Sequence, residues 1–191
     1  VICDTNAHGD YFAKEFQKDR DQIQTLYLKA DTSIYYPREV AKPETLKDRF
    51  IVLYFGSVLP LQGIEVIQEA MDLLKNEKDL YFYFIGPLKD GMEKVESPYV
   101  EYIPWLSQEE LAEYIAMSDL CLAGHFHPSI NKAKRTIPGK AYIYQAMGKP
   151  MILGDNPATR ELYAPGDGIY FVEMGNAKAL ADIILAIAQN K

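Results

Sequence analysis

The chain has 191 residues, of which 27 are acidic and 20 are basic, so its formal net charge is −7. This balance argues against a general nucleic-acid binder and against a protein that binds anionic membranes, because both need net positive charge. Hydrophobic residues make up 48% of the chain, which is enough to bury a core without disulfides or metal. No apolar run approaches the roughly 20 residues of a transmembrane helix, and no secretory signal is visible at the start.

The first 46 residues predict a small unit that differs from the rest of the chain. A strand is expected at "VIC", a helix over about 7–20 and a second strand at "IQTLYLK", followed by a loop that contains Pro37 and Pro43. We interpret residues 1–46 as one βαβ unit and a linker, the end of a preceding domain. The chain begins with Val rather than Met, as expected of a fragment of a longer protein.

Residues 47–191 alternate short apolar runs with amphipathic helical patterns. The expected strands are 50–56, 80–86, 99–103, 119–124, 150–154 and 168–172. Ser107 and Glu110 form a capping box before one helix, and Asn176 is the expected N-cap of the last helix. Continuous apolar strands separated by amphipathic helices are typical of a parallel sheet covered on both faces. We therefore predict an α/β fold with a Rossmann-like, doubly wound parallel sheet.

Ligands of open parallel sheets bind beyond the carboxyl ends of the strands, and the first such loop is "GSVLPLQG" at 56–63. Gly56 ends the strand and Gly63 precedes the next helix, so the backbone can approach a ligand and the helix N-terminus can receive an anion. The loop matches neither the dinucleotide glycine motif nor a Walker loop. A simple turn is the alternative.

Charge segregation gives a stronger signal. Residues 120–154 contain no Asp or Glu, whereas the rest of the chain carries 27 acidic and 15 basic residues. The basic residues in this segment are Lys132, Lys134, Arg135, Lys140 and Lys149. They surround a helix start expected near Pro138, and a helix N-terminus with Arg and Lys beside it suits a diphosphate. A solvated basic face is the alternative.

Four further residues, Cys121, His125, His127 and Trp105, are candidate ligand contacts. Cys121 with His125 and His127 could suggest zinc, but Cys121 lies in an apolar strand and the neighbouring cations would repel a metal, so we expect no metal and no cofactor. The two histidines are expected either to hydrogen-bond a sugar or phosphate or to be ordinary loop residues. Trp105 could stack on a base, although we favour packing. Cys3 and Cys121 fit no disulfide framework, which indicates a reducing, cytoplasmic setting.

Together these motifs resemble those of family 4 glycosyltransferases. The resemblance is carried by the glycine loop, by "IPGKAY" with "AMGKP", and by "GDNPATRE". It implies the C-terminal half of a GT-B enzyme, in which two Rossmann-like domains flank a cleft and the C-terminal domain binds a nucleotide-sugar donor. Such enzymes retain anomeric configuration and use no catalytic metal.

The resemblance also implies site residues by position. Ser57 and Gln62 stand where many members carry Arg and Lys for the diphosphate, so Arg135 and Lys140 are the expected substitutes. The two glutamates of the family are replaced by Arg135 and Ile143, and Ile cannot accept a hydrogen bond from the ribose. The expected donor-binding residues are Gly56, Ser57, Gln62, Gly63, Ile103, Trp105, Lys134, Arg135, Lys140, Tyr144 and Glu161. Backbone N–H groups around Gly56, Gln62 and Gly63 are expected to assist them.

The function expected from this resemblance is transfer of a sugar from a UDP- or GDP-sugar to a glycan or lipid-linked acceptor, in polysaccharide or lipopolysaccharide biosynthesis. The N-terminal domain of the same protein is the expected partner and the source of acceptor-side groups, so this fragment alone is expected to be inactive. The expected location is the cytoplasm, or the inner membrane surface if the N-terminal domain attaches there. The alternatives are a non-catalytic binding or scaffolding domain, favoured by the missing glutamates, and a sugar-nucleotide epimerase, for which residues 120–154 supply no acid–base side chain.

Overall fold

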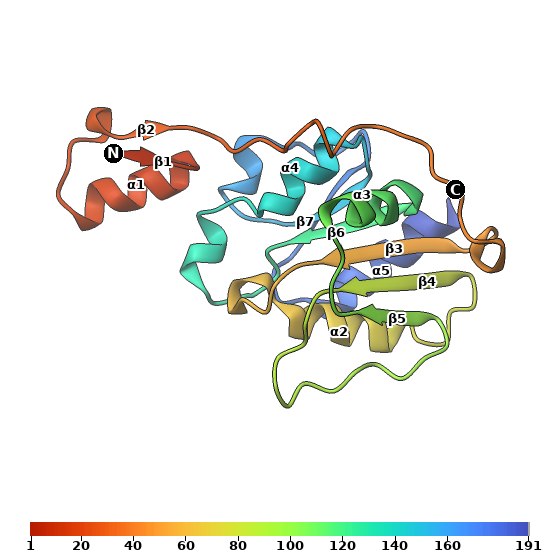
Figure 1. Cartoon of the computed structure of the whole chain (residues 1–191). Coiled ribbons are helices and arrows are strands. Elements are labelled where there is room, and N and C mark those ends of the chain that lie inside the picture. Colours follow the sequence, from red (N-terminus) through yellow and green to blue (C-terminus); the bar gives the residue numbers. More distant parts are fainter. Residues whose placement is uncertain (191) are drawn as a thin grey trace.

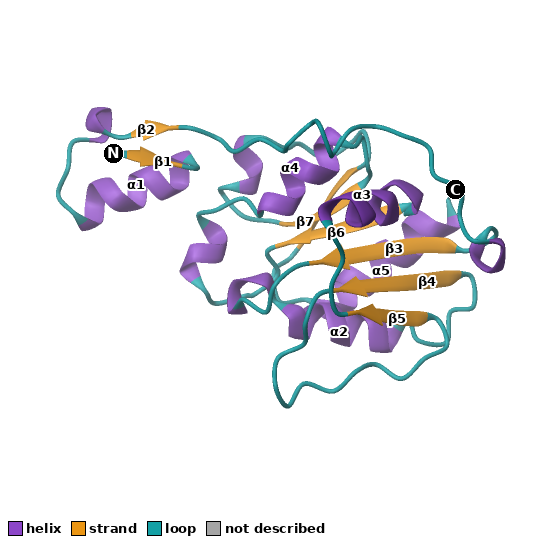
Figure 2. Ribbon diagram, in the orientation of Figure 1, coloured by secondary structure: helices purple, strands orange, loops and turns teal. Residues whose placement is uncertain are grey.

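The computed structural model describes residues 1–190 (Figure 1). Its first part, the N-terminal unit of residues 1–25, contains β1 (Ile2–Cys3), α1 (Asn6–Glu15) and β2 (Gln24–Thr25), with the two strands paired in parallel. The unit projects from the main body (Figures 1 and 2). Helix α1 ends five residues earlier than the sequence predicts, because Gln17 adopts a left-handed φ of 50° that an α-helix does not allow.

The main body holds a six-stranded parallel sheet, as predicted. Its strands are β3 (Phe50–Phe55), β4 (Leu80–Ile85), β5 (Val100–Ile103), β6 (Leu120–Gly124), β7 (Met151–Gly154) and β8 (Ile169–Val172). They are arranged in the order β5-β4-β3-β6-β7-β8. Each predicted strand is present, and the bounds differ by no more than one residue at either end. The order reverses between β3 and β6, the point at which open sheets of this kind bind their ligands.

Helices cover both faces of the sheet (Figure 2). Helices α3 (Gln108–Met117) and α4 (Gly139–Ala146) lie on one face, and α2 (Ile64–Leu73) and α5 (Ala177–Gln189) lie on the other. Side chains of the strands alternate between the two faces: Ile51 and Leu53 enter the α3–α4 core, whereas Val52 and Tyr54 enter the α2–α5 core. The continuous apolar strands of the sequence are explained by this burial on both faces.

The predicted helix starts are confirmed at three places. The Ser107 hydroxyl accepts from the Glu110 N–H while the Glu110 carboxylate accepts from the Ser107 N–H, which satisfies two otherwise free donors of α3. Asn176 caps α5 through the N–H of Ala179, and Pro138 is the N-cap of α4. No helix in the described part of the chain is long and apolar enough to cross a membrane.

Candidate functional site

Closely packed loops form the carboxyl edge of the sheet at the point where strand order reverses. Gly86 lies directly against this edge, because a Cβ there would stand 2.1 Å from the carbonyl oxygen of Gly56. Gly63 has a left-handed φ of 69°, and a Cβ there would stand 2.6 Å from the backbone after β6. Only glycine meets both demands at low cost. The loop after β3 is therefore fixed against the loops after β4 and β6.

A buried ammonium group lies beneath this edge. The Lys140 Nζ donates a hydrogen bond to Gln62 Oε1 at 2.5 Å and stands 4.7 Å from the ring centre of Tyr54. The Lys140 residue is only 5% exposed, and burial lowers the pKa of this amine from 10.5 to about 7. A Cβ at Gly56 would lie 3.1 Å from Nζ and 2.9 Å from the Tyr54 hydroxyl. The ammonium and the hydroxyl thus approach the same point at the end of β3.

The Tyr54 hydroxyl was not singled out by the sequence. It is buried, and no hydrogen-bond partner lies near it among the described residues. Burial raises its pKa, so it remains a protonated donor. Its strand position looks like any other core position, so only the tertiary structure shows that this hydroxyl lies beside Lys140.

The two histidines of the predicted loop occupy different environments. His125 is buried, and burial together with the charge of Lys140 lowers its pKa to about 4, so the ring is neutral and almost inaccessible. His127 is half-buried, and its Nδ1 accepts from the N–H groups of Ser129 and Ile130, both at 3.2 Å. A sugar could reach only the second of these rings.

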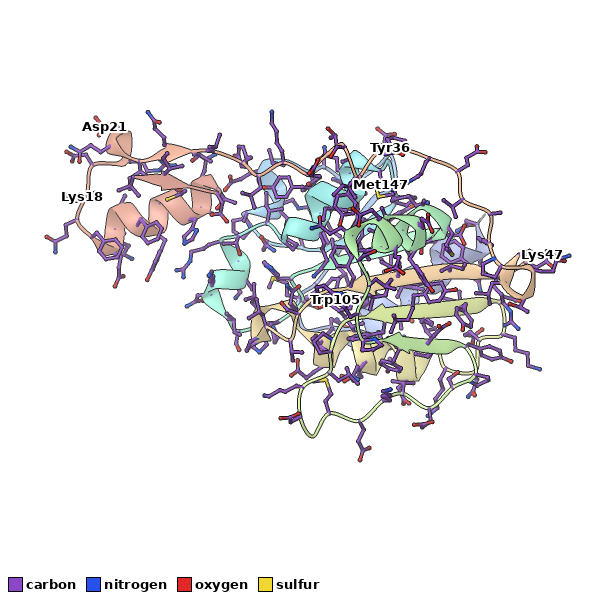
Figure 3. The ribbon with its side chains drawn as sticks, in the orientation of Figure 1. Lys18, Asp21, Tyr36, Lys47, Trp105 and Met147 are labelled. Atoms are coloured by element: carbon purple, nitrogen blue, oxygen red, sulfur yellow. The ribbon has the colours of Figure 1, made fainter. Side chains whose placement is uncertain are left out.

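An apolar slot opens next to the lysine, with a volume of about 540 Å³. Its walls come from the ends of β3, β4 and α3 and from the linker, and they include Tyr35, Phe55, Gly56, Ile85, Trp105 and Leu111. Trp105 lies in the loop after β5 (Figure 3) and is 80% exposed. The packing interpretation of Trp105 is therefore wrong, because its ring is free at the rim of the slot. Ser57 is exposed and also lines the slot. Ile103 is the last residue of β5 and comes directly before the slot-lining residues Pro104 and Trp105.

The expectation that backbone N–H groups of the glycine loop are free is wrong. The N–H of Gly56 donates to Ile85 O at 3.0 Å. The N–H groups of Gln62 and Gly63 donate to carbonyls three residues earlier, at 2.9 and 3.1 Å. These bonds close the short turn Pro60–Gln62. The N-terminus of α4 remains available instead, since the first N–H groups of a helix have no partner within it and the space beside Gly139 is open.

The basic residues of 120–154 do not converge, contrary to the expectation of one cationic pocket. Lys134 is exposed, and Lys149 donates to Ala116 O at 2.7 Å. The guanidinium of Arg135 stacks on Tyr11 of the N-terminal unit at 3.5 Å. Among these five residues only Lys140, on the first turn of α4, reaches the edge of the sheet, where its Nζ lies beside Gln62 and Tyr54.

Two other predicted residues have different surroundings from those expected. Tyr144 is fully buried, with its ring edge against Phe55 at 5.6 Å and its hydroxyl 3.5 Å from Leu122 O, so it supports the slot from below. The Glu161 carboxylate accepts hydrogen bonds from the N–H groups of Asn6 and Ala7 in the N-terminal unit and from the hydroxyl of Tyr27 in the segment that follows it. Within residues 1–190, no group of three or more His, Cys, Asp or Glu side chains could hold a metal ion.

Comparison with solved structures gives several that share this fold. HepE from Anabaena, solved with UDP-glucose, is 15% identical and superposes with a TM-score of 0.76, which covers 100% of this chain and 54% of HepE. The C-terminal domain of LpcC, a glycosyl transferase group 1 family protein from Francisella tularensis, is 17% identical with a TM-score of 0.61, over 84% of this chain and 88% of that domain.

A curated relative, a D-inositol 3-phosphate glycosyltransferase from a Nocardioides species, is 20% identical over 217 residues. The alignment covers 100% of this chain and 46% of the relative, so the chain spans about half the length of this curated relative. The family model for glycosyl transferases group 1 matches residues 49–190. Since this match includes the six-stranded sheet and Lys140, the chain belongs to the glycosyl transferases group 1 family and has the fold of the C-terminal domain of a GT-B glycosyltransferase.

Proposed function

We propose that this chain is the donor-binding half of a glycosyltransferase and that it takes a UDP-sugar. The observation that carries the proposal is the apolar slot beside a buried lysine at the reversal point of the sheet. A nucleobase needs an apolar wall and an aromatic face, and its diphosphate needs cationic and N–H donors. This arrangement offers both within one crevice. HepE, which shares the fold, was solved with UDP-glucose, and this favours UDP over the GDP alternative.

In this arrangement the base enters the slot and stacks on Trp105, while the diphosphate extends past Gly56 toward Lys140. The ammonium and the N–H groups of Gly139 and Lys140 at the start of α4 then face the phosphate oxygens. These donors are fixed before the donor binds, so they stabilise the negative charge that grows on the leaving diphosphate as the glycosidic bond breaks. Transfer with retention of configuration and without a catalytic metal is part of this proposal.

The acceptor side belongs to the N-terminal half of the protein in this proposal. The N-terminal unit presents large apolar side chains to solvent, since Val1, Ile2 and Phe16 are 66%, 67% and 60% exposed. Such surfaces normally lie against further protein, here the rest of an N-terminal domain. A glycan or lipid-linked acceptor would enter between the halves, in polysaccharide or lipopolysaccharide synthesis at the cytoplasmic side. One wall of the cleft cannot orient both substrates, so this fragment alone should show no turnover.

A second candidate is a domain that binds the sugar nucleotide without catalysis. Ile143 on α4 packs against the α3–α4 core and offers no hydrogen-bond acceptor at the place where the resemblance implies a glutamate. Ribose hydroxyls would then need another acceptor, or affinity would fall by about 1–3 kcal/mol.

The test is a fluorescence titration, because Trp105 is the single Trp of the chain. We expect UDP-glucose to change the Trp105 emission with saturation and GDP-mannose to act weakly or not at all. A W105F variant followed by calorimetry shows whether binding persists without the reporter. Binding of neither sugar nucleotide by calorimetry would refute the proposed function. Saturable binding with no transfer by the full-length protein would favour the second candidate.

A further inference from the structure

One carboxylate of the main body, that of Glu161, binds the N-terminal unit. Glu161 Oε2 accepts from the N–H of Asn6 and Oε1 accepts from the N–H of Ala7, both at 2.7 Å. The Tyr27 hydroxyl also donates to Glu161 Oε2 at 2.7 Å. Asn6 and Ala7 are the first two residues of α1, so the carboxylate sits directly on a helix N-terminus. Both of its oxygens are engaged.

Helix α1 lacks an acidic side chain of its own in this first turn. The N-terminus of a helix carries a partial positive charge and unpaired N–H groups. Thr5 satisfies one donor, the N–H of His8 at 3.0 Å. Glu161 supplies the missing negative charge from a residue 154 positions away in the sequence, so the charge complementarity of α1 is completed only when the two parts are docked.

Glu161 is held rigidly on its own side of this contact. It ends the short turn Thr159–Glu161 that follows β7. The Thr159 hydroxyl donates to Gly154 O at 2.8 Å, and the Thr159 N–H donates to Asn156 Oδ1 at 3.0 Å. These bonds are buried, so the turn is fixed to the end of the strand. The carboxylate is thereby presented from the same edge of the sheet that carries the slot and Lys140.

A second contact strengthens the docking. The Thr5 hydroxyl donates to the carbonyl oxygen of Arg135, and the Arg135 guanidinium stacks on the ring of Tyr11. The N-cap residue of α1 and a residue of its second turn therefore both contact Arg135, which lies in the loop after β6. Far from these contacts, Lys18 and Asp21 lie at the outer end of the N-terminal unit (Figure 3).

We propose that Glu161 is a positioning residue that fixes the N-terminal unit against the donor domain, rather than a group that binds the donor. In the transfer reaction its effect would act through α1, by setting the angle between the two walls of the cleft. This consequence for transfer rests on the proposed function, whereas the docking role rests only on the contacts described here.

Hydrogen exchange of the α1 amides tests the docking role in this 191-residue chain. A 10-residue helix is marginal by itself, so undocking exposes its amides. We expect E161Q to exchange roughly ten- to hundredfold faster across α1, because it loses charge-assisted hydrogen bonds. Y27F should give roughly a two- to tenfold increase, since one neutral donor is lost. E113Q, an exposed position on α3, is the matched control and should leave α1 unchanged.

A spectroscopic measurement separates this role from a general loss of structure. Burial and the bond to Glu161 raise the pKa of Tyr27 to about 12. In a carbon NMR titration of the tyrosine rings, E161Q should lower the Tyr27 pKa and leave Tyr81, which bonds Glu101, as it was. The UDP-glucose affinity of E161Q should equal that of the parent.

Unchanged α1 exchange in E161Q would overturn the proposal, whatever the chain binds. A fall in UDP-glucose affinity with unchanged α1 exchange would make Glu161 a donor contact. If neither protein binds UDP-glucose but α1 is released in E161Q, the proposed function fails while the docking role stands.

Discussion

Replacing Lys140 by Met tests the central feature of the site with little change in side-chain length. The ammonium of Lys140 is 5% exposed and has one side-chain hydrogen bond, to Gln62 at 2.5 Å. The nearest aromatic face, that of Tyr54, lies 4.7 Å away. No carboxylate forms an ion pair with Lys140 in the described structure. A buried, charged lysine without a neighbouring carboxylate lowers the folding stability. We ascribe the presence of this lysine to its proposed role in binding the donor diphosphate.

The magnitude follows from the pKa of Lys140, which falls from 10.5 to about 7 through burial. At 1.36 kcal/mol for each pKa unit, keeping the amine charged costs roughly 5 kcal/mol of folding free energy. The unfolded chain binds the extra proton between pH 7 and 10.5, so this cost is fully present below about pH 7 and disappears as pH rises toward 10.5. Met removes the cost but leaves the Gln62 amide oxygen without its donor, a loss of about 1–3 kcal/mol.

We therefore expect K140M to be more stable than the parent by about 2–4 kcal/mol at about pH 6, and less stable than it near pH 10.5. Urea unfolding at the two pH values measures this crossing. K78M, which removes an exposed lysine, should follow the parent at both. The neighbouring His125 has a pKa of about 4, so it does not titrate in this range.

Donor binding should also depend on the protonation of Lys140. A diphosphate beside Lys140 raises its pKa, so UDP-glucose binding near pH 8 should take up a proton, and the affinity should fall by up to tenfold per pH unit above about pH 7. Calorimetry in buffers of different ionisation enthalpy measures the uptake, and K140M should neither bind tightly nor take up a proton. The reasoning fails if parental affinity is independent of pH without proton uptake, or if K140M is the less stable protein at about pH 6.

Three further outcomes are expected. W105A should weaken UDP-glucose binding by about 1–3 kcal/mol, the value of a base–aromatic stack, with unchanged thermal stability because the ring is 80% exposed; equal affinity would remove Trp105 from the site. G63A should cost about 2–4 kcal/mol in chemical unfolding, because its Cβ would meet the backbone of 126–127 at 2.6 Å, whereas G91A, at a similar φ of 80° but in open space, should cost about 1 kcal/mol; equal losses would contradict the crowding. Cys121 should not react with a thiol reagent until the protein unfolds, since burial raises its pKa to about 12; rapid labelling in the native state would show that the strand opens.

The secondary structure of the main body could be predicted because each signal is local. Apolar runs bounded by turns are sufficient to locate the six strands, and Ser107 or Asn176 caps a helix only a few residues away. The parallel sheet and its ligand edge follow from the alternation of strands and helices. The two-residue strand β2 could not be bounded in the same way, because its length depends on how far β1 extends beside it.

The site required information that no single segment contains. The charge pattern of residues 120–154 singled out Lys140 together with four other cations, but their directions depend on how each segment packs. Lys140 reaches the end of β3 beside Gln62 and Tyr54, while Arg135 stacks on Tyr11, a residue 124 positions earlier. The sequence therefore predicted a cationic site, whereas long-range contacts decided which of the basic residues take part in it.

The sequence alone determined the fold, because burial on both faces of a parallel sheet leaves its mark on every strand and helix. Only the tertiary structure decided that Glu161 faces the N-terminus of α1, that Trp105 is free, and that the loop N–H groups are already bonded. Each of these depends on the approach of segments that are distant along the chain, and a local pattern cannot specify which distant partner satisfies a charge or a hydrogen bond.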